Sequence, residues 1–353
     1  MPLTAALPAE QRSGSDLASW PILHENPDAK LLQKVALTGR YQGFYANLDS
    51  NAGNLSRYET RRWRVGTSIE FLEDWTFQAD INIDPDLRGF YESTNDLYFT
   101  YQADSDLKFH LGRTKAVWGS QWRQSSKTFA FVEWGQLVDQ LRPTRAIGTS
   151  LEGQGGQWIW EAGLWSGHLD GEWSHFDRGA FATTSLGYDF ANKLDGVNRA
   201  EWRVDTVWNE AASGANAVKP YERAVSSWLW LEGERWDCFF DAMAAWGGRP
   251  AAFGFLTGGT FDVTDRLELT ARYEHSWSRK DGLRLPSRFA RQAPDLDGTE
   301  RGDNYHSLYA GFNYYLHGDQ LKLVGGIQFD GMTGGSGENY DGVTYWSGMR
   351  LYF

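Results

Sequence analysis

Apolar and polar residues alternate along most of this chain, from Val35 to its last residue. In residues 75–84, for example, every odd position from Trp75 to Ile83 is apolar and every even position is polar. A period of two predicts a β-strand with one apolar face. The segments with this pattern are 35–43, 62–71, 75–84, 97–103, 107–114, 158–164, 182–188, 200–208, 236–246, 267–277, 308–314, 321–329 and 345–353. Residues 225–231 are apolar on both faces, so their register is ambiguous, and residues 253–261 form a Gly-rich strand.

The connections between these strands alternate in length. Short polar connections fall at 72–74, 104–106, 153–156, 191–195, 233–235, 263–265 and 317–319. The connections between them are longer, at 47–56, 85–95, 115–142, 166–179, 209–221, 278–303 and 331–341. This asymmetry predicts an all-β fold, a transmembrane antiparallel β-barrel of about 16 strands with short periplasmic turns and long extracellular loops. A soluble propeller would show a repeat of about 40 residues, and the sequence has none.

Composition fits a barrel in a membrane. Hydrophobic residues make up 41% of the chain, yet aromatic residues reach 15%, as expected for a thin apolar band edged by aromatic girdles around a polar interior. The sequence contains no run of 18 apolar residues, so it predicts no transmembrane helix. The net charge of -12 argues against a nucleic-acid partner. The single cysteine, Cys238, excludes an intrachain disulfide framework.

The pattern divides the chain into two parts. Residues 1–31 are polar and interrupted by prolines, and we expect a periplasmic tail there, followed by the β-barrel at 32–353. The first residues lack a basic segment followed by an apolar one, so no signal peptide is visible and we expect the numbering to begin near the mature terminus. We expect the bacterial outer membrane, with its lipid and lipopolysaccharide, as the location. The alternating C-terminal segment ending at Phe353 agrees with this.

Several short motifs resemble the phosphate-selective porin O and P family. They are Arg61-Arg-Trp-Arg-Val-Gly66, Phe71-Leu-Glu-Asp-Trp-Thr-Phe77, Leu111-Gly-Arg-x-Lys115, Ser125-Ser-Lys127 with Phe131-Val-Glu133, Arg145-x-x-Gly148 and Glu161 to Gly167. The resemblance is strongest between Arg61 and Gly167. It implies a trimeric, sixteen-stranded outer-membrane porin that passes small anions, such as phosphate, by passive diffusion.

The resemblance also implies where the pore is narrow. The third long connection, residues 115–142, would fold inward as the constriction loop, with Trp122, Phe131 and Glu133 among its residues. Arginines in the lumen and a lysine in that loop would attract anions. The candidate pore and anion-binding residues are Arg40, Arg62, Arg64, Lys108, Lys115, Arg123, Lys127 and Arg145.

The residues themselves leave two questions open. Arg40, Arg62 and Arg64 form the best cluster of one sign on the predicted inward faces, and they either attract anions or pair with wall carboxylates. In the loop, Arg123 and Lys127 favour anions, whereas Glu133 and Asp139 oppose them.

Other functions receive weaker support from the sequence. A general or sugar-type porin, with Trp165, Trp173, Trp346 and Tyr352 stacking on sugar rings, and a non-conducting structural barrel are the alternatives. No catalytic residues, cofactor or metal are expected: His275 has no matching serine motif. The 166–179 connection carries His168, Asp170, His175 and Asp177, a combination that also suits a metal ion.

Overall fold

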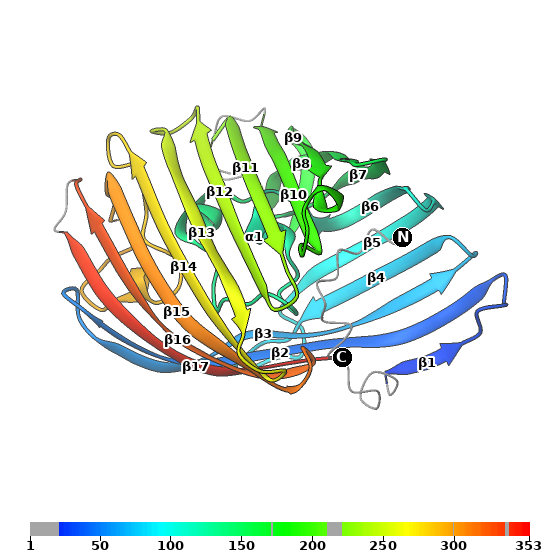
Figure 1. Cartoon of the computed structure of the whole chain (residues 1–353), viewed down its shortest axis with the longest axis horizontal. Helices are drawn as coiled ribbons and strands as arrows, with labels where there is room; N and C mark the ends of the chain where they lie inside the picture. The colour runs from blue at the N-terminus through cyan, green and yellow to red at the C-terminus, as the bar shows by residue number, and fades with distance from the viewer. Residues whose placement is uncertain (1–20, 171, 210–220, 299, 336–338) are drawn as a thin grey trace.

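The computed structural model describes residues 21–170, 172–209, 221–298, 300–335 and 339–353. Nearly all of them lie in one antiparallel sheet that curls into a barrel (Figure 1). The strands are β1 Ile22–Glu25, β2 Leu32–Ser50, β3 Leu55–Phe71, β4 Trp75–Asn82, β5 Ser93–Asp104, β6 Leu107–Lys115, β7 Arg145–Gly155, β8 Trp158–Asp170, β9 Trp173–Asp189, β10 Arg199–Asn209, β11 Arg223–Glu232, β12 Trp236–Trp246, β13 Ala252–Asp262, β14 Leu267–Ser278, β15 Asn304–His317, β16 Leu321–Thr333 and β17 Tyr340–Tyr352.

The sheet closes on itself between its first and last long strands. Each strand from β2 to β17 pairs with its neighbours in sequence, and β17 pairs with β2 from Tyr352↔Arg40 to Gly342↔Ser50. The short β1 pairs with β2. Of the seventeen strands, β2 to β17 therefore form a closed ring of sixteen, which confirms the predicted fold class. No helix in the described part of the chain is long and apolar enough to cross a membrane.

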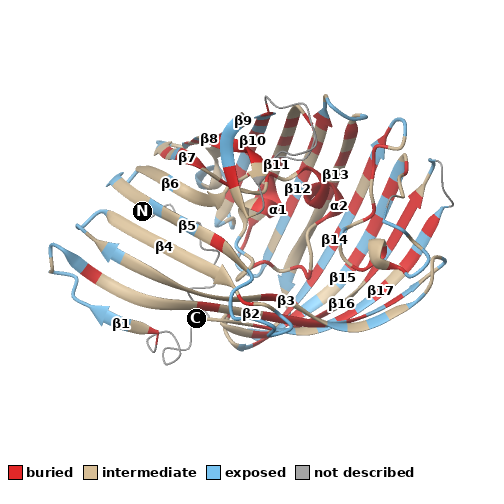
Figure 2. Ribbon diagram, turned by 180° about the vertical axis from the view of Figure 1, so that it is seen from behind, coloured by how far each residue is buried: buried red, intermediate tan, exposed pale blue. Residues whose placement is uncertain are grey.

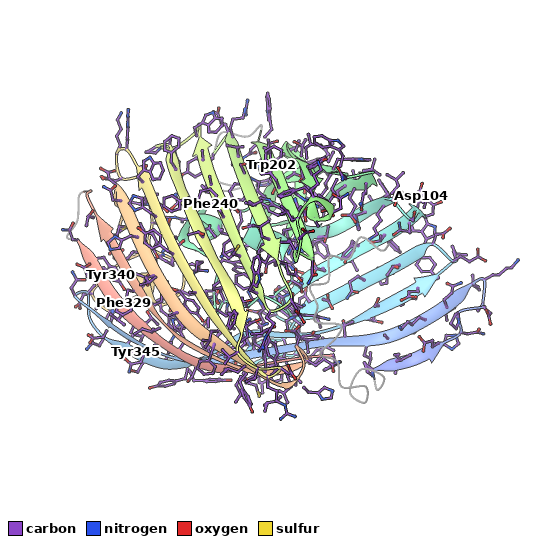
Figure 3. All side chains as sticks on the ribbon, in the orientation of Figure 1. Asp104, Trp202, Phe240, Phe329, Tyr340 and Tyr345 are labelled. Atoms are coloured by element: carbon purple, nitrogen blue, oxygen red, sulfur yellow. The ribbon has the colours of Figure 1, made fainter. Side chains whose placement is uncertain are left out.

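The strands present apolar side chains outward and polar side chains inward. On β14, Glu268, Thr270 and Arg272 are buried toward the lumen, whereas Leu269 and Tyr273 are exposed on the outside. Figure 3 labels Trp202, Phe240, Phe329 and Tyr345, which lie on β10, β12, β16 and β17 and are all exposed. The predicted faces are thus confirmed, because a barrel in lipid exposes its apolar band and keeps polar groups in its interior.

The register of β11 settles the ambiguity of residues 225–231. Ser226, Trp228, Trp230 and Glu232 are buried, and Val225, Ser227, Leu229 and Leu231 between them are half-buried. Two tryptophans of this strand therefore point into the barrel. Residues 252–262 form β13, so the predicted Gly-rich strand is confirmed as well.

One end of the barrel carries only short connections, at 72–74, 105–106, 156–157, 190–198, 233–235, 263–266 and 318–320. The 190–198 connection includes a 3-10 turn, Ala191–Lys193. The opposite end carries the connections 51–54, 83–92, 116–144, 171–172, 210–222, 247–251, 279–303 and 334–339. We call these the short-turn end and the long-loop end.

Two connections predicted to be long are short instead, because the strands on either side extend into them. Around 47–56 and 166–179 the strands continue past the apolar band, and β8 and β9 pair as far as Asp170↔Trp173. The tips of these strands are polar, so the alternation of apolar and polar residues did not predict that they pair. Strands that extend beyond the lipid need no apolar face. A bulge between Ser166 and His168 lets the β8–β9 hairpin bend.

Candidate functional site

The connection between β6 and β7, residues 116–144, lies inside the barrel (Figure 2). We call it loop L3. It contains two short helices, α1 Ser120–Arg123 and α2 Gln136–Leu141. Both helices contact the inner wall on the β10–β15 side.

Two wall arginines hold the middle of L3 by its backbone. The guanidinium of Arg350 on β17 donates to the carbonyl oxygens of Phe131 at 2.6 Å and Val132 at 3.1 Å, and also to that of Phe129. Arg272 on β14 donates to the carbonyl oxygen of Glu133 at 2.7 Å. Hydrogen bonds from a charged donor are stronger than neutral ones. These inward arginines therefore fasten the loop.

Carboxylates of the same wall hold the backbone N–H groups of L3. Gly119 and Ser120 donate to Asp205 and Asp241, each at 2.8 Å, and Gln136 donates to Glu274 at 2.7 Å. Gly119 has a φ of 69°, which only glycine adopts without strain and which aims consecutive N–H groups at the wall. These three acidic side chains of the wall are thus occupied by the loop.

Apolar packing completes the attachment. Phe131 is buried and meets Phe239 and Tyr309 edge to face, with ring centroids 5.8 Å apart in both pairs. Trp118, Val138 and Leu141 of L3 are buried as well. Phe131 accordingly lies on the attached side of the loop, against the wall.

The opposite wall, built by β2 to β7, is less covered by L3, most clearly at β4 and β6. On β4 and β6 no residue is buried, although the strands facing L3 alternate between buried and exposed positions (Figure 2). A cavity of about 240 Å³ lies between this wall and L3. Its lining includes six basic side chains, Arg40, Arg62, Arg64, Lys115, Arg123 and Arg145, and one carboxylate, Asp96.

Three of these arginines have no carboxylate within ion-pair distance among the described residues. Arg62 donates to the side-chain oxygen of Gln42 at 2.5 Å, and Arg64 donates to that of Asn82 at 2.9 Å. Arg40 donates to the hydroxyl oxygen of Ser126 in L3. Neutral acceptors orient these guanidiniums without cancelling their charge.

Beside them, a β-bulge turns a further arginine toward the lumen. The register of β2 and β3 shifts between Gln42↔Arg62 and Gly43↔Thr60, which leaves Arg61 as the extra residue. Arg61 forms an ion pair with Glu133 of L3. Burial raises the pKa of Glu133, but the nearby Arg61 and Arg62 outweigh burial and leave this pKa below its usual range.

An aromatic pair on L3 faces this basic wall. The rings of Trp122 and Trp134 meet at 5.1 Å, edge to face. Arg62 lies over the Trp134 ring at 4.8 Å, and Arg142 lies over Trp122 at 4.1 Å. Cation–π contacts of this kind hold guanidiniums in place without neutralising them.

The remaining predicted site residues divide into two groups. Arg145 pairs with Asp96 at 2.8 Å, and Arg123 pairs with Glu161 at 2.8 Å and Asp205 at 3.0 Å, so both are compensated. Lys115 donates to the carbonyl oxygen of Gln124 at 3.0 Å. Neither Lys115 nor Lys127 has an ion-pair partner among the described residues.

Lys127 titrates close to physiological pH. Burial, with Arg40 nearby, lowers the pKa of Lys127 to about 8. It lines a further cavity of about 200 Å³ together with Arg40, Arg64, Asp80 and Asp96. By contrast, Lys108 lies next to the short turn at 105–106 and pairs with Glu152 at 3.6 Å. The structure does not bring Lys108 to the basic cluster.

Sequence reasoning missed several residues of the site. Asp96 and Tyr98 line the cavities on β5, and Arg61 and Trp134 lie beside the arginines. The inward position of Tyr98 follows from the alternation of β5, which is the signal that identifies it. Arg61 carries no such signal, because a bulge reverses the alternation.

The suggested metal site finds no support among the described residues. No group of three His, Cys, Asp or Glu side chains in that part of the chain is arranged to hold a metal ion. His168 contacts Asp177 at 3.3 Å, and the side chain of Asp170 lies outside the described part.

A closed barrel with an inward loop and a polar, basic passage defines a membrane pore. The family model for phosphate-selective porin O and P matches residues 35–220, which is more than half of the 353 residues. The chain therefore belongs to this family. Family and fold indicate a channel rather than an enzyme, and they place it in the bacterial outer membrane.

Solved structures of outer-membrane porins share the fold at low identity. OprB of Pseudomonas putida at high pH has a TM-score of 0.60 and 13% identity over 90% of this chain and 94% of its own. The anion-selective porin from Comamonas acidovorans has a TM-score of 0.59 and 15% identity over 90% and 99%. The trimer form of Vibrio cholerae OmpT has a TM-score of 0.50 and 12% identity over 90% of this chain and 99% of its own. No curated protein sequence matched.

Proposed function

We propose that this porin prefers small anions, phosphate among them, and that L3 and the β2–β7 wall form its constriction. The observation that carries this proposal is the cavity with six basic side chains and one carboxylate, in a chain whose net charge is -12. Unpaired charges of one sign along a pore select ions, whereas paired charges leave little field. Arginine suits the task, because its planar group binds phosphate or carboxylate with two hydrogen bonds.

The acidic residues of the chain do not oppose this. Asp205, Asp241 and Glu274 accept hydrogen bonds from the L3 backbone on the opposite wall. Asp96 is neutralised by Arg145. Asp80, which lines the neighbouring cavity with Arg40 and Arg64, accepts a hydrogen bond from the neutral Thr38 at 2.8 Å. One carboxylate without an ion-pair partner among the described residues thus faces Arg40, Arg62 and Arg64, so the passage keeps an excess of positive charge.

The proposed assembly is a homotrimer surrounded by outer-membrane lipid and lipopolysaccharide. A trimer form exists for OmpT, a porin with the same fold. The tail at 1–31 is proposed to remain in the periplasm, although residues 1–20 lie outside the described residues.

Ion selectivity of the purified protein in planar bilayers tests the proposal. Under a KCl gradient we expect a reversal potential that corresponds to chloride preference. The double variant Arg40→Gln with Arg64→Gln removes two unpaired charges and should lower the chloride-to-potassium permeability ratio several-fold. The matched control, Lys108→Gln, removes a charge that is paired with Glu152 and lies outside the basic cavity, so it should change the ratio far less.

Cation preference of the wild-type channel would overturn the proposal, and absence of conductance in a folded barrel would favour the structural alternative. Heat-modifiable gel migration confirms that each variant is folded.

A further inference from the structure

A third cavity, of about 550 Å³, lies between L3 and the short-turn ends of β7, β8, β10 and β11. It shares Lys115, Arg123 and Tyr98 with the basic cavity, so the two adjoin. Its lining combines charged side chains, among them the carboxylates Glu152 and Glu161, with aromatic and aliphatic ones. The aromatic and aliphatic side chains are Tyr98, Val117, Ile159, Trp160, Trp228, Trp230 and Tyr352.

Most inward positions of a porin barrel are polar. Strand β11 places Trp228 and Trp230 inward, between the polar residues Ser226 and Glu232. Both belong to the buried apolar cluster that also contains Trp118 and Phe131 of L3, and both also line the cavity.

Both tryptophans are fixed in place. The indole N–H of Trp228 donates to Asp205 at 2.9 Å, and Trp228 is buried. The Trp230 ring stacks on Phe239 with centroids 5.3 Å apart and planes 12° apart. Rings held in this way form a surface that is organised before any solute arrives, which lowers the entropic cost of binding.

Positively charged side chains line the same cavity. Arg199 and Arg203 pair with Glu201, and Arg123 pairs with Glu161 and Asp205. Among the described residues, Lys127 forms no ion pair and one cation–π contact, in which its ammonium nitrogen lies 5.0 Å from the centroid of the Tyr352 ring. Its ammonium group is thus available to an anionic solute whose body lies against the aromatic wall.

We propose that this cavity is a binding subsite for small organic anions with a flat apolar body, of which an aromatic carboxylate is the simplest. The carboxylate meets Lys127 and Lys115, and the ring packs against Trp228, Trp230 and Ile159. This rests on the proposed anion preference and names the class of solute. Inorganic phosphate has no apolar surface for this wall, and a neutral sugar has no charge for the lysines.

The size of the cavity agrees with such a ligand. Small-molecule sites span roughly 300–1,000 Å³ and combine apolar walls with a few polar groups. Binding in a channel must be weak enough for release, so we expect partial, reversible block rather than tight occupancy.

Block of the chloride current by added anions tests the subsite. Benzoate should reduce the wild-type current at roughly tenfold lower concentration than acetate or inorganic phosphate, because only benzoate contacts the aromatic wall. The variant Trp230→Leu should raise the half-blocking concentration of benzoate roughly three- to tenfold and leave that of acetate and the chloride preference unchanged. The matched control is Trp246→Leu, a tryptophan exposed on the outside of the barrel, which should change none of these values.

The outcomes separate the two proposals. If the wild-type channel prefers anions but benzoate blocks no better than acetate, the subsite is overturned and the anion preference stands. Block by maltose oligosaccharides in place of benzoate would also overturn it, in favour of a sugar subsite. A cation-preferring channel would instead overturn the function on which the subsite rests. The comparison of benzoate with acetate uses the wild-type protein, so it remains decisive even if Trp230→Leu fails to fold.

Discussion

Arg64 on β3 and Arg350 on β17 both point into the lumen, but their surroundings differ. Arg350 is buried, and its guanidinium donates to carbonyl oxygens of L3. Arg64 is half-buried beside the open passage and donates to the neutral oxygen of Asn82. The same residue type on the same face therefore fastens a loop on one wall and offers its charge to the pore on the other.

The difference extends to the whole of each wall. On the β10–β17 side five inward charged side chains bind the backbone of L3: Arg272 and Arg350 donate to its carbonyls, and Asp205, Asp241 and Glu274 accept from its N–H groups. On the β2–β7 side Arg40, Arg62 and Arg64 have neutral partners. The position of one loop thus decides which charges a solute meets, and this explains a basic passage in an acidic protein.

The largest effect is expected from Arg350→Met, which removes the main backbone anchor of L3. The carbonyls of Phe131 and Val132 lose a charged donor, so the free energy of unfolding should fall by about 3 kcal/mol. The loosened loop should also raise single-channel conductance. Denaturant unfolding in detergent, followed by tryptophan fluorescence, and bilayer recordings measure the two changes.

Arg350→Lys serves as the control for this variant. It keeps one charged donor and should recover part of the stability. Unchanged conductance in a folded, destabilised Arg350→Met barrel would mean that L3 does not set the width of the passage.

A smaller effect is expected from Glu133→Gln, which removes the carboxylate that pairs with Arg61. Without its carboxylate partner, Arg61 adds its charge to the basic wall, and the chloride-to-potassium permeability ratio should rise about twofold. Loss of the partly buried ion pair should cost about 2 kcal/mol of unfolding free energy. Reversal potentials give the first quantity and denaturant unfolding gives the second.

The control is Asp86→Asn, which removes the ion pair between Asp86 and Arg88. This pair is far more exposed than the Arg61–Glu133 pair, so the substitution should change neither value measurably. A fall in the permeability ratio of Glu133→Gln would show that Arg61 does not contribute to the field of the passage.

The smallest effect concerns pH. Because burial and Arg40 lower the pKa of Lys127 to about 8, Lys127 is charged below that pH and loses its proton as the pH rises through it. Anion preference should therefore decline modestly between pH 7 and pH 9. Reversal potentials recorded at several pH values measure the decline.

Lys127→Arg should reduce this decline, since arginine keeps its charge throughout the range. A decline of unchanged size in Lys127→Arg would assign the titration to another group.

The local pattern of the sequence determined much of the fold of this protein. The alternation of residues with period two fixed the strands, their inward and outward faces and the short turns, because each depends on neighbours in sequence and on the contrast between lipid and lumen. Arg40, Arg62 and Arg64 were identified as a cluster of one sign in this way.

The tertiary structure alone decided how those side chains are used. The bulge at Arg61, the short connections at the tips of β2–β3 and β8–β9, and the inward tryptophans of β11 depend on strand pairing, which period-two patterns do not specify. Whether an inward arginine binds a backbone carbonyl of L3 or remains unpaired depends on where a distant loop packs. That contact joins residues more than 200 positions apart, as in the bond from Arg350 to Phe131, separated by 219.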